Sequence, residues 1–333
     1  MKAIKRGVFR GIGAPGIAFL ALTAALVLIG PQAAWAKRPH PVRTSSEGPD
    51  PTPVSACGTY GSPTVNDTIF YLTTNLTVST DGGTCIILAG TNNALNLYGF
   101  NITGPGASKS TAYGIEITGT HTVVEGFNAV ISGFMYGIYD NGTQDFGDDV
   151  NVTENVYGLV IGSTNHTHDW SNFAAYSNTA SGIWMDGCVD DCFLTDFLAY
   201  NNGGNGVLLH DTTGAAVSVF IAADNALNGV ELDGTNSGAV VADAYLTDLS
   251  FIDSPYTSVS GNTENGIYLA SGESHDQVTT VYADGNGNDT AYFDLRDGNT
   301  TCGTDLWFNN TFTTAEANTT KYPTATCFHG LGD

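Results

Sequence analysis

The chain has 333 residues, with 33 acidic side chains against 10 lysines and arginines. From Cys57 to the end, 31 acidic residues face three bases, Lys109, Arg296 and Lys321, which leaves about 28 net negative charges on this part. Such a field repels phosphate backbones and anionic lipids, so it excludes nucleic acid as a partner and favours cations and neutral polymers. The alternative is that the acidity only keeps the protein soluble.

The N-terminal segment predicts export. A basic start is followed by the apolar run Gly16 to Ile29 and by Ala34-Trp35-Ala36, a small-x-small cleavage site. This is the pattern of a signal peptide over residues 1–36, and its apolar run is too short for a membrane anchor. We therefore expect a secreted product, extracellular or periplasmic, without a transmembrane segment. Residues 37–56 are rich in proline and predict an extended linker before a domain at 57–333.

A pattern of glycine, aliphatic residue, any residue and aliphatic residue recurs through this domain. Its copies begin at Gly114, Gly137, Gly158, Gly182, Gly206, Gly229 and Gly266, in steps of 23, 21, 24, 24, 23 and 37 residues. Alternation with a period of two predicts strands, and strands this short bury their apolar side only by stacking on the next copy. The repeat therefore predicts an all-β solenoid with coils of about 21–25 residues.

An asparagine stands four residues before the glycine in several coils. The members of this column are Asn178, Asn202, Asn225 and Asn262. Stacked at one inward turn, their amides can hydrogen-bond along the solenoid axis. We interpret the column as a structural asparagine ladder.

The combined repeat, N-x-x-x-G-[IVL]-x-[LIM], resembles that of the right-handed parallel β-helix proteins of the pectate-lyase-like superfamily. The segments around Cys57-Gly58-Thr59 and Cys327-Phe328 also resemble the first and last coils of that superfamily. The resemblance implies a right-handed, single-stranded parallel β-helix. It leaves the reaction open, because the superfamily contains lyases, hydrolases, epimerases and non-enzymatic surface proteins.

The cysteines predict disulfides, as expected of an exported protein. Six cysteines allow fifteen pairings, of which the spacing favours Cys57–Cys85, Cys188–Cys192 and Cys302–Cys327.

Candidate catalytic residues follow from the repeat. With each glycine as position zero, positions +1 and +3 face the core, so +2 and +4 face outward. At +4, Asp186, His210 and Asp233 fall on three successive coils. Two coils separate the carboxylates by about 9–10 Å, which is near the upper end of the acid–base separation in inverting glycosidases. The alternative is that outward positions are polar anyway and that these residues only open turns.

Candidate binding residues lie on the same face. Trp184, Glu231 and Tyr268 occupy +2 positions, where the aromatic rings can contact sugars. A further pair, Asp190-Asp191, offers the hard oxygen ligands that suit calcium, which is therefore a possible cofactor. The alternative for this pair is ordinary turn aspartates on an acidic surface.

Two functions remain open. In the first, the protein binds or processes a neutral polysaccharide, so its partner is an extracellular glycan or cell-surface polymer. In the second, it is a non-catalytic surface or adhesion protein. If it is an enzyme, we expect a hydrolase rather than a lyase or epimerase. The resemblance implies that an elimination would use an arginine or lysine as the base, and this domain has only three such residues, which the repeat does not bring together.

Overall fold

The computed structural model describes residues 50–79, 83–109, 111–162, 167–189, 192–246, 261–287, 291–299, 304–308, 310–312, 314–317 and 328–329. The chain divides into two units, Met1–Thr44 and Ser45–Asp333. The first unit, with the predicted signal peptide, lies outside the described residues. The second unit is the solenoid.

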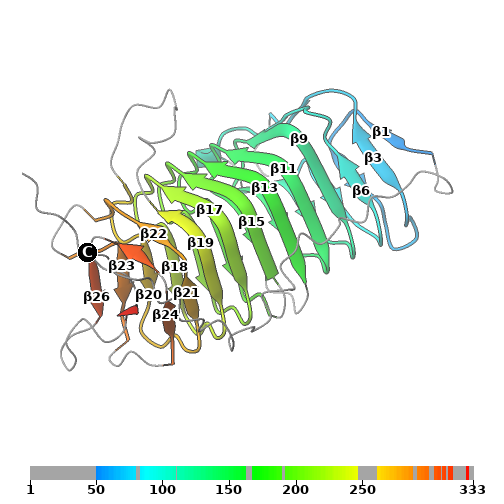
Figure 1. Cartoon of the computed structure of the whole chain (residues 1–333). Helices are drawn as coiled ribbons and strands as arrows, with labels where there is room; N and C mark the ends of the chain where they lie inside the picture. The colour runs from blue at the N-terminus through cyan, green and yellow to red at the C-terminus, as the bar shows by residue number, and fades with distance from the viewer. Residues whose placement is uncertain are drawn as a thin grey trace, which may run out of the picture. The chain divides into compact units, whose positions relative to one another are not determined.

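The solenoid is a parallel β-helix, as the sequence predicted, and it has about nine turns. In the described ranges it has a sheet of 16 strands, here sheet A, and a sheet of 11 strands, here sheet B. Each strand pairs in parallel with the equivalent strand of the next coil, and Figure 1 shows β9 to β19 of sheet A side by side. The only described helix is the short 3-10 turn η2 (Ala107–Lys109), and no described helix has the length and apolarity to cross a membrane.

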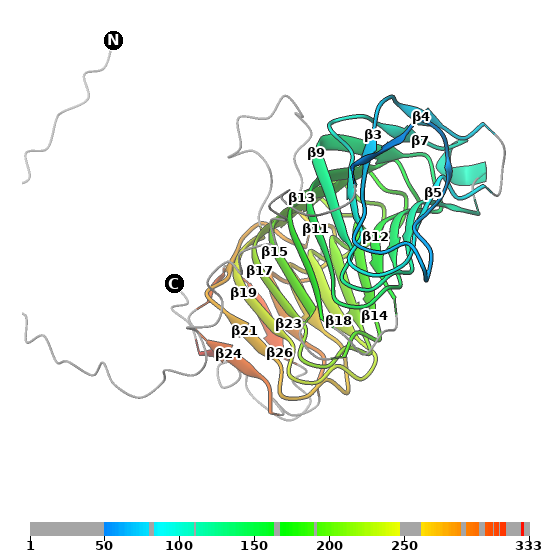
Figure 2. The same cartoon turned by 90° about the vertical axis from the view of Figure 1, so that its right-hand side faces the viewer.

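Sheet A contains, in spatial order, β1 (Thr52–Val54), β3 (Ile69–Leu72), β6 (Ala94–Asn96), β9 (Val123–Ser132), β11 (Asp145–Thr153), β13 (His168–Tyr176), β15 (Cys192–Tyr200), β17 (Ala216–Ala223), β19 (Val240–Leu246), β21 (Gln277–Thr279), β24 (Leu306–Phe308) and β27 (Phe328–His329), with β4 (Leu76–Thr77), β7 (Ile102–Thr103), β22 (Tyr282–Ala283) and β25 (Thr311–Phe312) beside this row. Sheet B contains β2 (Gly58–Tyr60), β5 (Ile86–Leu88), β8 (Tyr113–Ile117), β10 (Tyr136–Asp140), β12 (Tyr157–Ile161), β14 (Ile183–Asp186), β16 (Val207–His210), β18 (Val230–Asp233), β20 (Ile267–Leu269), β23 (Leu295–Asp297) and β26 (Ala315–Ala317). Figure 2 shows strands of both sheets around the same coils.

The core consists of aliphatic columns from the two sheets. In β14, β16 and β18 the +1 and +3 residues are buried and the +2 and +4 residues are half-buried, as the repeat predicts. In sheet A the rings of Phe173, Phe197 and Phe220 stack with centroids 5.2 and 5.0 Å apart inside the solenoid. Apolar burial along the whole stack, rather than within one coil, therefore stabilises the fold.

The asparagine ladder explains why glycine recurs. The Nδ2 of Asn178 donates to Oδ1 of Asn202 at 3.0 Å, and the bonds continue through Asn225 and Asn262 to Asn286. A Cβ on Gly182 would lie 2.6 Å from the Asn202 amide nitrogen of the next coil. Glycine is needed because any side chain at this inward position would collide with the ladder.

The long strands of sheet A bend at one column of left-handed residues. This column contains Asn128, Asp149, Asn172, Asp196 and Val219, with φ between 49° and 61°. Asparagine and aspartate adopt this conformation more readily than other residues, whereas a β-branched residue such as Val219 does so rarely. The bend gives every long coil a corner within sheet A.

The start of the solenoid corrects one predicted boundary. Strand β1 begins at Thr52, inside the segment expected to be linker, and Val54 is fully buried. Pro53 had suggested an irregular chain, but β1 is the outermost strand of sheet A, and an edge strand tolerates proline.

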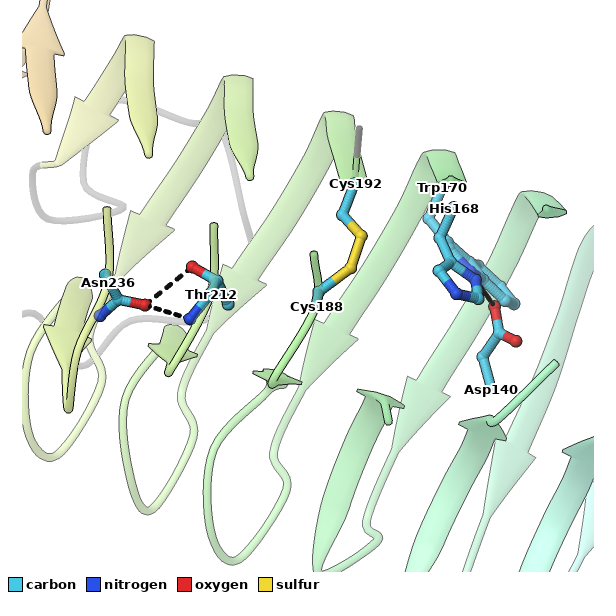
Figure 3. Close-up of a disulfide and its surroundings, with 7 residues drawn as sticks. All are labelled: Asp140, His168, Trp170, Cys188, Cys192, Thr212 and Asn236. Atoms are coloured by element: carbon cyan, nitrogen blue, oxygen red, sulfur yellow. Dashed lines mark hydrogen bonds and ion pairs between the residues drawn. A yellow bond between two sulfur atoms is a disulfide. The ribbon is translucent and has the colours of Figure 1, made fainter. Parts of the chain in front are cut away.

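Two of the favoured disulfides are present. Cys57–Cys85 joins the first two coils beside β2 and β5, and Cys188–Cys192 closes a turn between β14 and β15. Figure 3 shows the second bond in the interior corner of the solenoid, one coil away from His168. The third predicted pair, Cys302–Cys327, lies outside the described residues.

Candidate functional site

The outward face of sheet B carries a continuous row of aromatic rings. The row contains Tyr113, Tyr136, Tyr139, Tyr157 and Trp184, from strands β8, β10 and β12 and from β14. Neighbouring centroids lie 5.0–5.6 Å apart, and every ring is half-buried. We call these five residues the aromatic row. Four consecutive strands carry it, so it extends about 14 Å along the stack.

Three members of the aromatic row were not predicted from the sequence. Strict alternation places the residue before each repeat glycine in the core, yet Tyr113, Tyr136 and Tyr157 face outward. The alternation breaks because the glycine itself faces the interior; Gly137, for instance, lies against the Asn155 amide. The signal was therefore present in the repeat, as a tyrosine at position −1 of three successive coils.

A glycine in the following coil makes room for the ring of Tyr139. A Cβ on Gly162 would lie 3.0 Å from the Tyr139 hydroxyl oxygen, so the ring extends over this glycine. Val160, expected to face solvent, is 2% exposed because it lies between Tyr139 and Trp184 on the neighbouring strands. Burial raises the pKa of Tyr136 and of Tyr139, and the adjacent Tyr113 adds to both shifts. Their hydroxyl groups therefore stay protonated at neutral pH and can donate hydrogen bonds.

The predicted column of Asp186, His210 and Asp233 lies on the same face, next to the aromatic row. The three residues pair on consecutive strands β14, β16 and β18, as the repeat predicts. His210 Nδ1 lies 3.7 Å from Asp233 Oδ2, and its Nε2 lies 3.5 Å from Oδ2 of Asp211. These distances allow ion pairing but exceed a good hydrogen bond. The structure thus brings the three residues together, and their catalytic role stays a prediction.

Glu231 takes part in a second amide ladder. Asn205, Asn228 and Asn265 continue the −1 column beyond the tyrosines, and the Asn205 and Asn228 amides donate to Glu231 Oε2 at 2.6 and 3.2 Å. Burial raises the pKa of Glu231, while these two hydrogen bonds oppose the shift. The neighbouring Tyr268 lies under the guanidinium of Arg296, 5.3 Å from its Cζ. Glu231 is therefore held by the fold, whatever it contributes to binding.

One group of described residues could hold a metal ion, and the predicted calcium ligands are not part of it. Asp190 and Asp191, the expected calcium ligands, are outside those residues. Among the described ones, one group brings three ligand atoms within 4.8 Å of one another, and it is formed by Asp140, Asp145 and His168. All three side chains are inside the solenoid and fully buried.

No protein-family model and no curated protein matches the sequence. Solved structures match it in fold. The Dettilon tailspike protein has a TM-score of 0.58 at 14% identity, over 80% of this chain and 54% of that chain. A tailspike protein of E. coli bacteriophage HK620, solved in complex with a pentasaccharide, has a TM-score of 0.52 at 10% identity, over 84% of this chain and 57% of that one.

A third similar structure is the A-module of the mannuronan C-5 epimerase AlgE6 from Azotobacter vinelandii, with a TM-score of 0.54 at 13% identity, over 84% of this chain and 88% of that module. These likenesses show the fold. This chain spans about half the length of the two tailspike chains, 54% and 57%. Of these three proteins, the epimerase is named for mannuronan and the HK620 tailspike was solved with a pentasaccharide. Each of the three differs from this chain at more than four positions in five.

Proposed function

We propose that this chain is an exported protein that binds an extracellular polysaccharide along the outward face of sheet B. The aromatic row carries the proposal, because polysaccharides present apolar C–H faces and hydroxyl groups side by side. Half-buried tyrosines offer the same combination, an apolar ring with a hydroxyl donor at its tip. The pentasaccharide bound by one similar tailspike supports a saccharide ligand for a β-helix of this kind.

The charge of the domain favours a neutral polymer. Asp186, Asp233 and Glu116 lie beside the aromatic row, and bases are rare in the domain. A polyanion such as a polyuronate would be repelled along its whole length, more strongly at low ionic strength.

The binding test compares neutral and anionic polysaccharides by affinity electrophoresis of the mature protein. We expect retardation by at least one neutral polymer and none by polyuronates. Trp184→Ala should weaken this retardation about tenfold, since it ends the aromatic row. Tyr98→Ala is the matched control, because Tyr98 is a 56% exposed ring next to sheet A. Equal loss in both variants would contradict binding on sheet B.

Hydrolysis on this face is the catalytic form of the proposal. Asp186 and Asp233 flank His210, and a carboxylate separation of about 9–10 Å leaves room for a water between acid and base. With a neutral polymer that the protein binds as the substrate, Asp186→Asn and Asp233→Asn should each lower the rate of hydrolysis about 100-fold or more. Neither variant should change the retardation of the protein by that polymer. Unchanged hydrolysis in both would remove this column from the mechanism.

A non-catalytic surface protein is the second candidate, and the geometry of the same column favours it. The nearest carboxylate oxygens to His210 are at 3.5 and 3.7 Å, and all three side chains involved are 36–51% exposed. A catalytic acid or base is more often held by hydrogen bonds in a water-excluding pocket. Retardation by a polymer that is never shortened would support binding alone.

A further inference from the structure

A cluster of ionisable side chains lies inside the solenoid beneath the aromatic row. Asp140 ends β10, Asp145 begins β11 and His168 begins β13, and all are 0% exposed. Asp140 occupies a +3 position, which Ile117 and Ile161 fill in the two neighbouring coils. A carboxylate at an aliphatic core position is costly unless an opposite charge compensates it.

The Asp145 carboxyl group is oriented so that one oxygen faces the cluster. Its Oδ1 accepts hydrogen bonds from the backbone nitrogen and the hydroxyl of Thr122, at 2.7 and 2.6 Å. Its Oδ2 is buried, accepts no hydrogen bond from a described residue and faces the Asp140 carboxylate. A Cβ on Gly142 would lie 2.0 Å from this oxygen, so the glycine keeps the space beside it open.

The Asp140 carboxylate is held just as firmly. Its Oδ2 accepts a hydrogen bond from the Trp170 indole nitrogen at 2.9 Å and lies 3.0 Å from Nδ1 of His168. Figure 3 shows the Trp170 and His168 rings beside the Asp140 carboxyl group. Its Oδ1 accepts from the Gly142 nitrogen at 3.3 Å. The indole fits because residue 147 is glycine; a Cβ there would lie 2.0 Å from the Trp170 ring. Such outer hydrogen bonds orient ligand atoms in metal sites.

We propose that Asp140, Asp145 and His168 bind one divalent transition-metal cation, such as Zn²⁺, Mn²⁺ or Co²⁺. Two carboxylates balance the charge of the ion, and a neutral imidazole adds a third ligand without changing that balance. A mixed oxygen and nitrogen set suits these ions better than Ca²⁺ or Mg²⁺, which prefer oxygen ligands alone. The 3.0 Å between His168 Nδ1 and Asp140 Oδ2 fits two ligands of one ion with bonds of about 2.0–2.2 Å.

The proposed site is structural and independent of the proposed glycan site. The same strand, β10, carries Asp140 inward and Tyr136 and Tyr139 outward. A cation here would join β10, β11 and β13 from the inside and stiffen the coils that carry the aromatic row.

Because the ligands are fully buried, the test loads the ion during folding. The full mature chain, with its disulfides oxidised, is unfolded in guanidinium and refolded with Zn²⁺ or with a chelator. It is then washed in excess Ca²⁺ to remove ions held by surface carboxylates. We expect one retained Zn²⁺ per chain and a higher melting temperature than after refolding in chelator. No retained Zn²⁺ would overturn the proposal and leave the cluster as a network of shared protons.

The matched variants separate this site from the acidic surface. Asp145→Asn keeps the Oδ1 acceptor for Thr122 and replaces only the inward oxygen by an amide that can donate to Asp140. It should bind Zn²⁺ at least about 100-fold more weakly, whereas Asp186→Asn, on the outward face, should retain one ion per chain. Equal retention in Asp145→Asn and the wild type would overturn the proposal.

Refolding of the wild type with Co²⁺ gives a readout that does not depend on any variant folding. A low-coordinate site with a nitrogen ligand gives intense visible absorption bands, and we expect these bands to survive the Ca²⁺ wash. A weak, octahedral Co²⁺ spectrum, or loss of the bands in the wash, would contradict a buried site.

Discussion

The two halves of the outward face of sheet B use the same column of the repeat for different purposes. In the coils of β8, β10 and β12, position −1 holds the stacked Tyr113, Tyr136 and Tyr157. In the coils of β16, β18 and β20, the same position holds the hydrogen-bonded asparagines of the second amide ladder. The rings are half-buried, whereas the asparagines are 1–3% exposed.

This difference shows which half is available to a ligand. The amides of the second ladder bond to one another and to Glu231, so they have little capacity left for a ligand. The tyrosines contact one another through their rings and leave hydroxyl groups to bond elsewhere. The same repeat thus provides stiffness in one half and a binding surface in the other.

The interior of the two halves differs as well. Asp140, in the aromatic half, pairs with His168 and accepts from Trp170. Its equivalent in the last coils, Asp297, accepts from Trp307 at 3.4 Å and lies near the Asp305 carboxyl group. Burial raises the pKa of Asp297 to about 6. The two clusters are otherwise similar and differ in the group beside the aspartate, which is a histidine for Asp140 and a carboxyl group for Asp297.

The largest expected effect is the loss of stability on breaking the second ladder. In Asn228→Ala, the Asn265 backbone and side-chain nitrogens lose the Oδ1 acceptor that they contact at 3.0 and 2.8 Å. Burying these groups without partners should lower the free energy of unfolding by about 3–5 kcal/mol. Denaturant unfolding measures this loss, and glycan binding of the folded fraction should not change.

Asn141→Ala is the control for that variant, because Asn141 is an exposed asparagine on the same face. It should change stability by less than about 0.5 kcal/mol. If Asn228→Ala weakened glycan binding as much as it lowered stability, the division of the face into two halves would be wrong.

The next effect is a loss of binding on removing a central ring of the aromatic row. Tyr136 contacts Tyr113, Tyr139 and Tyr157. Tyr136→Ala should weaken polysaccharide binding by about 1–2 kcal/mol, or roughly tenfold, with a smaller cost in stability. Tyr176→Ala removes a stacked ring from sheet A and should leave binding unchanged. Comparable losses in the two variants would mean that the aromatic rings act only on stability.

The smallest effect is a pH dependence that comes from two carboxyl groups in the last coils. Burial raises the pKa of Glu273 and of Asp276 to about 7 each. A carboxyl group whose pKa rises on folding stabilises the fold below its unfolded pKa of about 4, and this contribution is lost progressively as pH rises from about 4 to about 7. We therefore expect the melting temperature to fall between pH 5 and pH 8.

Asp276→Asn isolates this contribution. The asparagine keeps an oxygen for the Ala239 nitrogen, which donates to Asp276 Oδ1 at 2.8 Å, but it cannot ionise. Its fall in melting temperature over the same range should be roughly 2–4 °C smaller than that of the wild type. The exposed Asp196→Asn should behave as the wild type. If the melting temperature of Asp276→Asn fell as much as that of the wild type, Asp276 would not be a source of the pH dependence.

The sequence predicted the fold well because glycine, asparagine and aliphatic residues recur at the length of one coil. Their columns identify which residues stack, so the ladder from Asn178 to Asn262 and the adjacency of Asp186, His210 and Asp233 followed directly. The start of the first strand at Thr52 could not be predicted in this way. The segment around it is rich in proline, and a single short strand leaves no sign in that composition.

The sequence predicted the site less well for two reasons. Simple alternation fails at the repeat glycine, so the outward position of the tyrosines at −1 was not predicted. Asp140 gave a different difficulty. It stands at a +3 position, where the repeat leads one to expect an aliphatic residue, and Asp145 and His168 come from other strands, at a corner that the repeat does not describe.

Hydroxyl-radical footprinting with and without a bound neutral polysaccharide tests the central claim most directly, because it needs no substitution. Saturating polymer should protect Tyr113, Tyr136, Tyr157 and Trp184 from oxidation and leave Tyr176, on sheet A, unprotected. Protection of Tyr176 with unchanged oxidation of the aromatic row would contradict binding on sheet B.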